Sequence, residues 1–305
     1  MFRPVTGDEE LQAVKRVLDS GWLGKGQVTA QLESEFARHV EVSPANIVSV
    51  NCATEGLYQV FRALSSCGVS EVILPAISFV GVGNAAHRAG LDITLCDVDP
   101  RTLCARAEDI KEALNRTIGG AVALALLHYG GASCEMDDIL SLVEFESDVY
   151  LVEDAAHAHH SKFLSKALGT LGDFGVWSLD AMKPMTAGDG GLIYCREESE
   201  AQNIRKACYL GLDVESGFKN SSDKWWEFTS DGQGLRNVMN DIESAIALEQ
   251  LKKLNGFVSK RLSVALRYDA CLRNLDWLTL PPSTPQHVES THYFYWIQTA
   301  HRDAL

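Results

Sequence analysis

Seven short apolar runs recur along the chain up to residue 195, and their spacing constrains the fold more than any other feature. The runs cover residues 47–52, 71–76, 92–99, 121–129, 149–156, 173–179 and 191–195. Several are apolar on both faces, as strands are when helices cover both sides of a sheet. Residues 54–67, between the first two runs, carry apolar side chains at i, i+3, i+4 and i+7 of one helical face. Strands that alternate with helices predict an α/β fold with a mainly parallel seven-stranded sheet and helices on both faces.

The sequence pattern changes after about residue 200. Residues 213–233 are polar and aromatic without a clear period, which predicts an ordered loop. The adjacent Trp225 and Trp226 in this loop serve either core packing or contact with a substrate or a second subunit. Residues 241–275 predict a long helix. The segments WLTLPP (277–282) and YFYWIQTA (293–300) predict two strands of a smaller sheet.

Net charge and cysteine spacing exclude several classes of function. The net charge of −14 over 305 residues, without basic clusters, argues against binding to nucleic acid or to an anionic membrane surface. An anionic small ligand stays possible, because backbone N–H groups often bind phosphate. The eight cysteines show no CxxC spacing, so we expect no metal site and infer a reducing, cytoplasmic setting. The longest purely apolar run, residues 121–127, is too short to span a bilayer, and the N-terminus lacks the apolar segment of a signal peptide.

Two candidate ligand-binding segments follow predicted strands. In NCATEGL (51–57) a buried strand ends and a helix is expected to start at Thr54. The free N–H groups and the dipole of that helix start suit a phosphate, although Thr54 can also act as a simple N-cap. In VEDAAHA (152–158) a strand delivers Glu153 and Asp154 to its carboxyl end. These acids can cap a helix, bind magnesium, or keep a protonated ring nitrogen charged.

Two further segments carry single residues of interest. Lys183 lies in WSLDAMKPMTAGDGG (177–191), between two apolar runs, with Ser178 five residues before it. It is either an ordinary solvated lysine or a partly desolvated amine with a lowered pKa, the kind that forms a Schiff base. Phe79, just after another strand, either belongs to the core or stacks on a flat ligand. The order of these parts is that of a fold-type I pyridoxal phosphate (PLP) enzyme.

Six segments together resemble the DegT/DnrJ/EryC1/StrS aminotransferase family, over nearly the whole chain. They are SGWLGKGQVTAQLESEFARHV, NCATEGL, LPAISFVGVGNAA, VEDAAHA, GDFGVWSLDAMKPMTAGDGG and GLRNVMNDIESAIALEQLKKL. The segment from residue 153 to residue 191 carries the most specific motifs. The resemblance implies fold type I, with a large PLP-binding domain over residues 1–235. Residues 236–305 would form a linking helix and an incomplete small α+β domain, because relatives continue beyond the final HRDAL.

The resemblance also implies a role for each residue around the cofactor ring. Lys183 would hold the cofactor as a Schiff base and then move the proton between the substrate Cα and the cofactor. Asp154 would pair with the pyridine nitrogen, and His157 would lie near the 3′-oxygen of the ring. Phe79 would stack on one face of the ring.

The phosphate would be held by a second set of residues, again by resemblance. Ser178 would bind it together with the backbone or side chains of Thr54 and Glu55. A second subunit would complete the site through Arg236, with Asn237 one position away from the family pattern. Glu55 departs from that pattern, because relatives carry a small residue there and an acid beside a phosphate is unexpected.

The implied activity is transfer of an amino group, from glutamate, onto a nucleotide-linked keto-sugar by a homodimer. Two alternatives remain open at this point. One is a PLP-dependent sugar dehydratase, in which the lysine is replaced in known relatives; Lys183 argues against it, and His157, His159 and His160 leave it open. The other is an inactive relative that binds a ligand without turnover, which Glu55 and the chain end at HRDAL suggest.

Overall fold

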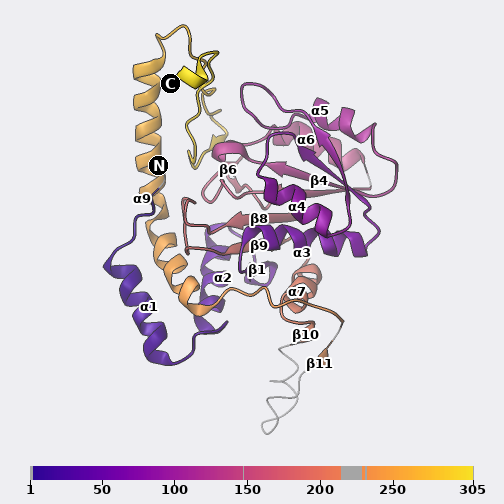
Figure 1. Cartoon of the computed structure of the whole chain (residues 1–305), viewed down its shortest axis with the longest axis vertical. Helices are drawn as coiled ribbons and strands as arrows, with labels where there is room; N and C mark the ends of the chain where they lie inside the picture. The colour runs from indigo at the N-terminus through magenta and orange to yellow at the C-terminus, as the bar shows by residue number, and fades with distance from the viewer. Residues whose placement is uncertain (1–2, 147, 214–228, 231, 305) are drawn as a thin grey trace.

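The computed structural model describes residues 3–146, 148–213, 229–230 and 232–304, and its centre is a seven-stranded sheet (Figure 1). The strands are β1 (Ile47–Val50), β2 (Glu71–Pro75), β3 (Asp92–Cys96), β4 (Val122–Leu127), β5 (Val149–Asp154), β8 (Phe174–Ser178) and β9 (Gly191–Cys195). Their order is β1-β9-β8-β5-β4-β2-β3, and β9 alone runs against the other six. Each strand lies within its predicted run, so the predicted mainly parallel seven-stranded sheet is confirmed.

Helices cover both faces of this sheet and divide the core into two layers. The helices are α1 (Asp8–Ser20), α2 (Gln27–His39), α3 (Ala53–Ser66), α4 (Val80–Arg88), α5 (Ala107–Leu114), α6 (Met136–Phe145), α7 (Glu198–Ala207) and α9 (Asp241–Leu272). Helices α2, α5, α6 and α9 pack on one face, and α3, α4 and α7 pack on the other. Neighbouring positions of a strand point to opposite faces, so Ile47 joins the first layer and Val48 the second. Among the described residues, no helix has the length and apolar character needed to cross a membrane.

The C-terminal part runs along one side of the molecule. Helix α9 packs against α1 and α2, and the chain then returns beside α9 (Figure 1). A three-stranded sheet joins β12 (Val288–Glu289) to β6 (Lys162–Phe163) and β7 (Lys166–Ala167). The predicted loop at 213–233, with Trp225 and Trp226, lies mostly outside the described residues, apart from short β10 (Leu212–Asp213) and β11 (Thr229–Ser230).

The two strands predicted over 277–282 and 293–300 are wrong as continuous strands. The described chain forms one isolated bridge there, between Thr279 and Gln298. Backbone N–H groups around residues 291–293 bond to other parts of the chain instead: Tyr293 N donates to Gly130 O at 2.8 Å, and Thr291 N donates to Ser161 Oγ at 2.9 Å. The C-terminal segment is therefore anchored to the turns that follow β4 and β5.

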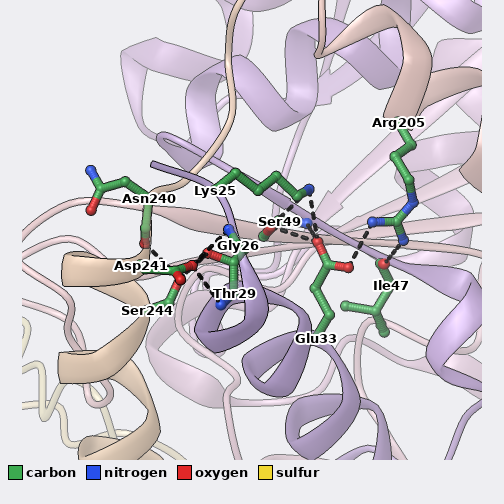
Figure 2. Close-up of polar contacts among 10 residues, drawn as sticks. All are labelled: Lys25, Gly26, Thr29, Glu33, Ile47, Ser49, Arg205, Asn240, Asp241 and Ser244. Carbon is green, nitrogen blue, oxygen red and sulfur yellow. Dashed lines mark hydrogen bonds and ion pairs between the residues drawn. The ribbon is translucent and has the colours of Figure 1, made fainter. Parts of the chain in front are cut away.

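A buried aspartate joins the start of α9 to the start of α2 (Figure 2). The carboxylate of Asp241 accepts hydrogen bonds from Gly26 N at 2.8 Å, Thr29 N at 2.9 Å and Thr29 Oγ1 at 2.6 Å. Helix α2 begins after Gly26, which has no side chain to cap it. Asp241 therefore supplies the N-cap that the local sequence lacks, from more than two hundred residues away.

A second buried carboxylate, that of Glu33, ties α2 to β1 and α7 (Figure 2). Its Oε1 accepts from Ser49 N at 3.0 Å and from Lys25 Nζ at 3.1 Å, and its Oε2 accepts from Arg205 Nη1 at 2.6 Å. Burial by itself would raise the pKa of Glu33. The charges of Lys25 and Arg205 more than offset that effect and lower the pKa to about 2.

We predict that this cluster makes stability depend on pH. The folded-state pKa of Glu33 lies below the ordinary value of 4.5, so its stabilisation is complete above pH 4.5 and is lost as the pH falls toward 2. Glu33→Gln should lower the free energy of unfolding by about 3 kcal/mol at pH 6.5. At pH 3.5 the same substitution should lower the free energy of unfolding by about 1.4 kcal/mol less than it does at pH 6.5. Urea unfolding at both pH values measures this.

The matched control is Glu35→Gln on the same helix, where the carboxylate is partly exposed and pairs with Arg38. It should change the free energy of unfolding by less than about 1 kcal/mol at either pH. A Glu33→Gln deficit of the same size at both pH values would contradict the assigned charge cluster.

Candidate active site

The sequence-predicted residues gather at one edge of the sheet, because β1, β2, β5 and β8 all run in the same direction. Helix α3 starts after β1, Phe79 follows β2, Asp154 ends β5, and Ser178 ends β8. Lys183 follows on the connection from β8 to β9. The carboxyl edge of an open α/β sheet is where such folds bind ligands.

Asp154 and Lys183 form the electrostatic centre of this edge. Asp154 is 5% exposed, and its Oδ1 accepts a hydrogen bond from Ala156 N at 3.0 Å. Burial raises the pKa of Asp154, against the effects of the Ala156 hydrogen bond and the charge of Lys183. Burial lowers the pKa of Lys183, against the charges of Asp154 and Asp180. Lys183 is thus a partly desolvated amine, and the surface-lysine alternative is wrong.

The connection that carries Lys183 is held by its own hydrogen bonds. Lys183 N donates to Asp180 O at 2.9 Å, and Met182 N donates to Asp180 Oδ1 at 2.9 Å. Ala187 N then closes the connection by donating to Leu179 O at 2.8 Å. The backbone at Lys183 is therefore fixed relative to the end of β8.

His157 lies against Lys183 and against an aromatic residue that the sequence did not single out. Its Nδ1 accepts from Gly130 N at 3.3 Å, so the ring proton resides on Nε2. Burial first, and Lys183 second, lower the pKa of His157 to about 2, so the ring is neutral. Tyr293 stacks on it with centroids 4.5 Å apart, and Lys183 Nζ lies 5.1 Å from the Tyr293 centroid. The sequence placed Tyr293 in a strand of the small sheet.

The first turn of α3 differs in detail from the predicted phosphate turn. The helix begins at Ala53, and its N-cap is Cys52, whose Sγ accepts from Glu55 N at 3.4 Å. The expected start at Thr54, and its role as N-cap, are therefore wrong. Thr54 instead faces the first turn of α4, where a Cβ on Gly81 would lie 2.8 Å from Thr54 Oγ1. Two helix starts meet here, and their free N–H groups favour an anion.

The remaining predicted residues fall into different surroundings. Phe79 is 70% exposed at the N-cap position of α4, so the core alternative is wrong. Ser178 is buried, and its Oγ accepts from Asp180 N at 3.4 Å. Arg236 is exposed, and its guanidinium carbon lies 5.1 Å from the centroid of Tyr209. It is Asn237 that reaches the α3 turn within one chain, through a hydrogen bond to Glu55.

Glu153 has a structural role, which removes the magnesium alternative for it. Its Oε1 accepts from Leu171 N and Gly172 N, both at 2.6 Å. Its Oε2 accepts from Gly169 N at 2.8 Å and pairs with buried His128 Nε2 at 2.9 Å. Four donors therefore occupy the carboxylate. Within the described ranges no group of three His, Cys, Asp or Glu side chains is placed to hold a metal ion.

His159 supports the end of β8. In the sequence it stood out only as a possible replacement for the lysine. Its Nε2 lies 2.6 Å from Ser178 O, and a carbonyl only accepts, so Nε2 carries the proton. Burial lowers the pKa of His159 to about 3, despite the hydrogen bond to Ser178. The ring is 1% exposed and neutral, and it fixes the backbone from which the Lys183 connection starts.

The strand order and directions are those of fold type I of the PLP-dependent transferases, the class of protein that the fold defines. A family model, the DegT/DnrJ/EryC1/StrS aminotransferase family, matches residues 4–305. The chain belongs to this family, which confirms the resemblance seen in the sequence motifs.

Named relatives are sugar aminotransferases or proteins of polysaccharide biosynthesis. The chain is 38% identical to a dTDP-4-dehydro-2,3,6-trideoxy-D-glucose 4-aminotransferase of Saccharopolyspora spinosa, over 98% of this chain and 77% of the relative. It is 31% identical to the spore coat polysaccharide biosynthesis protein SpsC of Bacillus subtilis, over 91% and 70%. The crystal structure of the aminotransferase TlmJ from Streptoalloteichus hindustanus superimposes with a TM-score of 0.87 at 41% identity, covering 99% of this chain and 80% of that one.

We predict that His159 stabilises the β8 end through its single donor. His159→Leu removes the bond to Ser178 O and should lower the free energy of unfolding by about 2 kcal/mol. His159→Gln keeps an N–H donor and should recover at least half of that loss. His160→Leu is the control, because the buried Nδ1 of His160 has no partner among the described residues. Equal losses in all three variants, measured by urea unfolding, would show that the bond to Ser178 is not the cause.

Proposed function

We propose that this chain is a PLP-dependent aminotransferase that transfers an amino group from an amino-acid donor, glutamate, to the keto carbon of a nucleotide-linked sugar. The observation that carries the proposal is the charge interaction between buried Asp154 and half-buried Lys183 at the carboxyl edge of the sheet. The named activity of the Saccharopolyspora spinosa relative supports the substrate class, since that enzyme aminates a nucleotide-linked keto-sugar.

The residues at this edge fit the cofactor. Asp154 is buried and accepts one hydrogen bond among the described residues, so it keeps acceptor capacity for a protonated ring nitrogen. Exposed Phe79 offers an aromatic face for a flat ring. The starts of α3 and α4 meet at Thr54 and Gly81, and their N–H groups suit the phosphate. A Cβ on Gly191 would lie 2.8 Å from Ala53 N, so glycine there lets β9 approach this turn closely.

The chemistry divides between the cofactor and the protein. When bound, PLP supplies an aldehyde and an electron-withdrawing ring. Lys183 Nζ would bind the aldehyde carbon with loss of water, and its lowered pKa favours the neutral amine needed for that bond. Once the donor had displaced it, Lys183 Nζ would carry the proton from the donor Cα to the aldehyde-derived carbon of the cofactor. In the second half-reaction it would carry a proton from that carbon to the acceptor carbon of the sugar.

Asp154 and His157 would keep the cofactor ring in the protonation state that this proton transfer requires. Asp154 would keep the ring nitrogen protonated, because a buried carboxylate favours a nearby cation. Neutral His157 carries its proton on Nε2, so by the family resemblance it would donate a hydrogen bond to the 3′-oxygen. Tyr293 stacks on His157 and limits the motion of its ring.

A homodimer completes the proposed site. Apolar side chains are exposed at the same edge as Lys183, namely Ile77, Phe79, Val80 and Met182. An exposed apolar surface next to a ligand site is typical of a subunit interface. By the family resemblance, the partner subunit's Arg236 would contribute to binding of the phosphate. All eight cysteines are free, which supports a reducing compartment, the cytoplasm.

We predict a Lys183-dependent absorbance band in the visible range when PLP is added to the purified protein. Glutamate should bleach this band, because amino transfer leaves the cofactor in its amine form. Lys183→Ala should abolish the band, and Lys162→Ala, which removes a lysine paired with Glu41, should retain it. A band that glutamate does not change would contradict glutamate as donor. The absence of any band in the wild-type protein would contradict the proposed cofactor.

A further inference from the structure

Glu55 places a negative charge in the first turn of α3, where the proposed phosphate site lies. It is the third residue after the N-cap Cys52, and its own N–H donates to Cys52 Sγ at 3.4 Å. A carboxylate at this position is favourable for the helix alone, since it complements the helix dipole. It is unfavourable for a bound phosphate, because two negative groups at one helix start repel each other.

The structure shows what compensates this charge. Arg88 Nη1 lies 2.9 Å from Glu55 Oε2, and Asn237 Nδ2 donates to Glu55 Oε1 at 2.5 Å. The Glu55 side chain is 14% exposed, whereas the Arg88 side chain is 53% exposed. The Arg88 guanidinium also stacks 4.1 Å from the centroid of Tyr58, which limits its motion. Both carboxylate oxygens are therefore engaged, one by a cation and one by an amide.

The pair belongs to the same two helices that form the anion site. Thr54 on α3 meets Gly81 on α4 at the helix starts, and Glu55 is linked to Arg88 at the last residue of α4. The bond to Asn237 adds the segment that precedes α9. One carboxylate thus connects three segments around the turn, and Arg88 supplies the only positive charge bonded to it among the described residues.

We propose that Arg88 is a positioning residue for binding of the cofactor phosphate. Its ion pair with Glu55 neutralises the carboxylate and holds it toward α4, which reduces the repulsion between Glu55 and the phosphate. The inference rests on the proposed function, because it needs a phosphate-bearing cofactor at α3. It predicts opposite effects of the two partners on cofactor affinity. Removing Arg88 releases a charge that repels the phosphate, whereas removing Glu55 removes the repulsion itself.

The test is a double-variant cycle on the full chain, with the dissociation constant of PLP measured by spectroscopic titration at low salt. Arg88→Met should weaken PLP binding about tenfold, as expected for one uncompensated charge near a dianion in partly screened surroundings. Glu55→Gln should tighten it roughly twofold, and the double variant should return to within about threefold of wild type. Raising the salt concentration should shrink the Arg88→Met deficit.

Controls separate this electrostatic role from a structural link between α3 and α4. Arg62→Met removes the same charge from α3 at a guanidinium that donates to Gln233 O, and it should leave PLP affinity within about twofold of wild type. Arg88→Lys keeps the charge and should bind PLP nearly as well as wild type. Thermal unfolding of each variant without cofactor identifies any variant that does not fold. If Arg88→Met does not fold, the PLP affinities of Glu55→Gln and Arg88→Lys still test the inference.

Three outcomes would overturn the inference while leaving the proposed function intact. The double variant could bind PLP as weakly as Arg88→Met, which would mean that Arg88 contacts the phosphate directly. Glu55→Gln could weaken binding, which would mean that the pair acts only as a link between the helices. Arg88→Met could bind as tightly as wild type. Failure of the proposed function itself would look different, because wild-type protein would then bind no PLP at all.

Discussion

The site depends on one physical constraint: the buried carboxylate of Asp154 and the half-buried amine of Lys183 interact at the carboxyl edge of the sheet. Burial acts against both charges, raising the pKa of Asp154 and lowering that of Lys183. For Lys183 this favours the neutral amine, which can attack an aldehyde. The charge of Lys183 stabilises the buried carboxylate of Asp154, and a protonated ring nitrogen would stabilise it further.

The surrounding fold keeps this edge rigid through buried polar contacts rather than through loops alone. Asp241 caps α2 from the start of α9, and Glu33 joins α2 to β1 and α7 (Figure 2). His159 fixes the end of β8, just before the Lys183 connection. Reactive groups on strand ends that are held in this way keep their mutual geometry, which amino transfer requires in both half-reactions.

Local pattern predicted the sheet, because several strands are apolar on both faces. It also singled out residues that follow strand ends, such as Asp154 and Ser178, and the structure places these at the carboxyl edge. The features that sequence missed depend on contacts between distant residues. Cys52 is not a residue type that favours the N-cap, so the helix start appeared to lie at Thr54. Tyr293 lies near Lys183 in a segment whose backbone bonds to the distant Gly130. Glu55 departs from the family pattern in the sequence, and the sequence does not show that Arg88 pairs with it in the fold.

The central claim is that Lys183 is the residue that binds the cofactor covalently. Its most direct test is reduction of the PLP-loaded protein with borohydride, followed by proteolysis and mass spectrometry to locate the pyridoxyl group. We predict that the modification lies on the peptide containing Lys183 and that prior addition of glutamate removes it. Modification at a different lysine, with Lys183 unmodified, would contradict the site described for this protein.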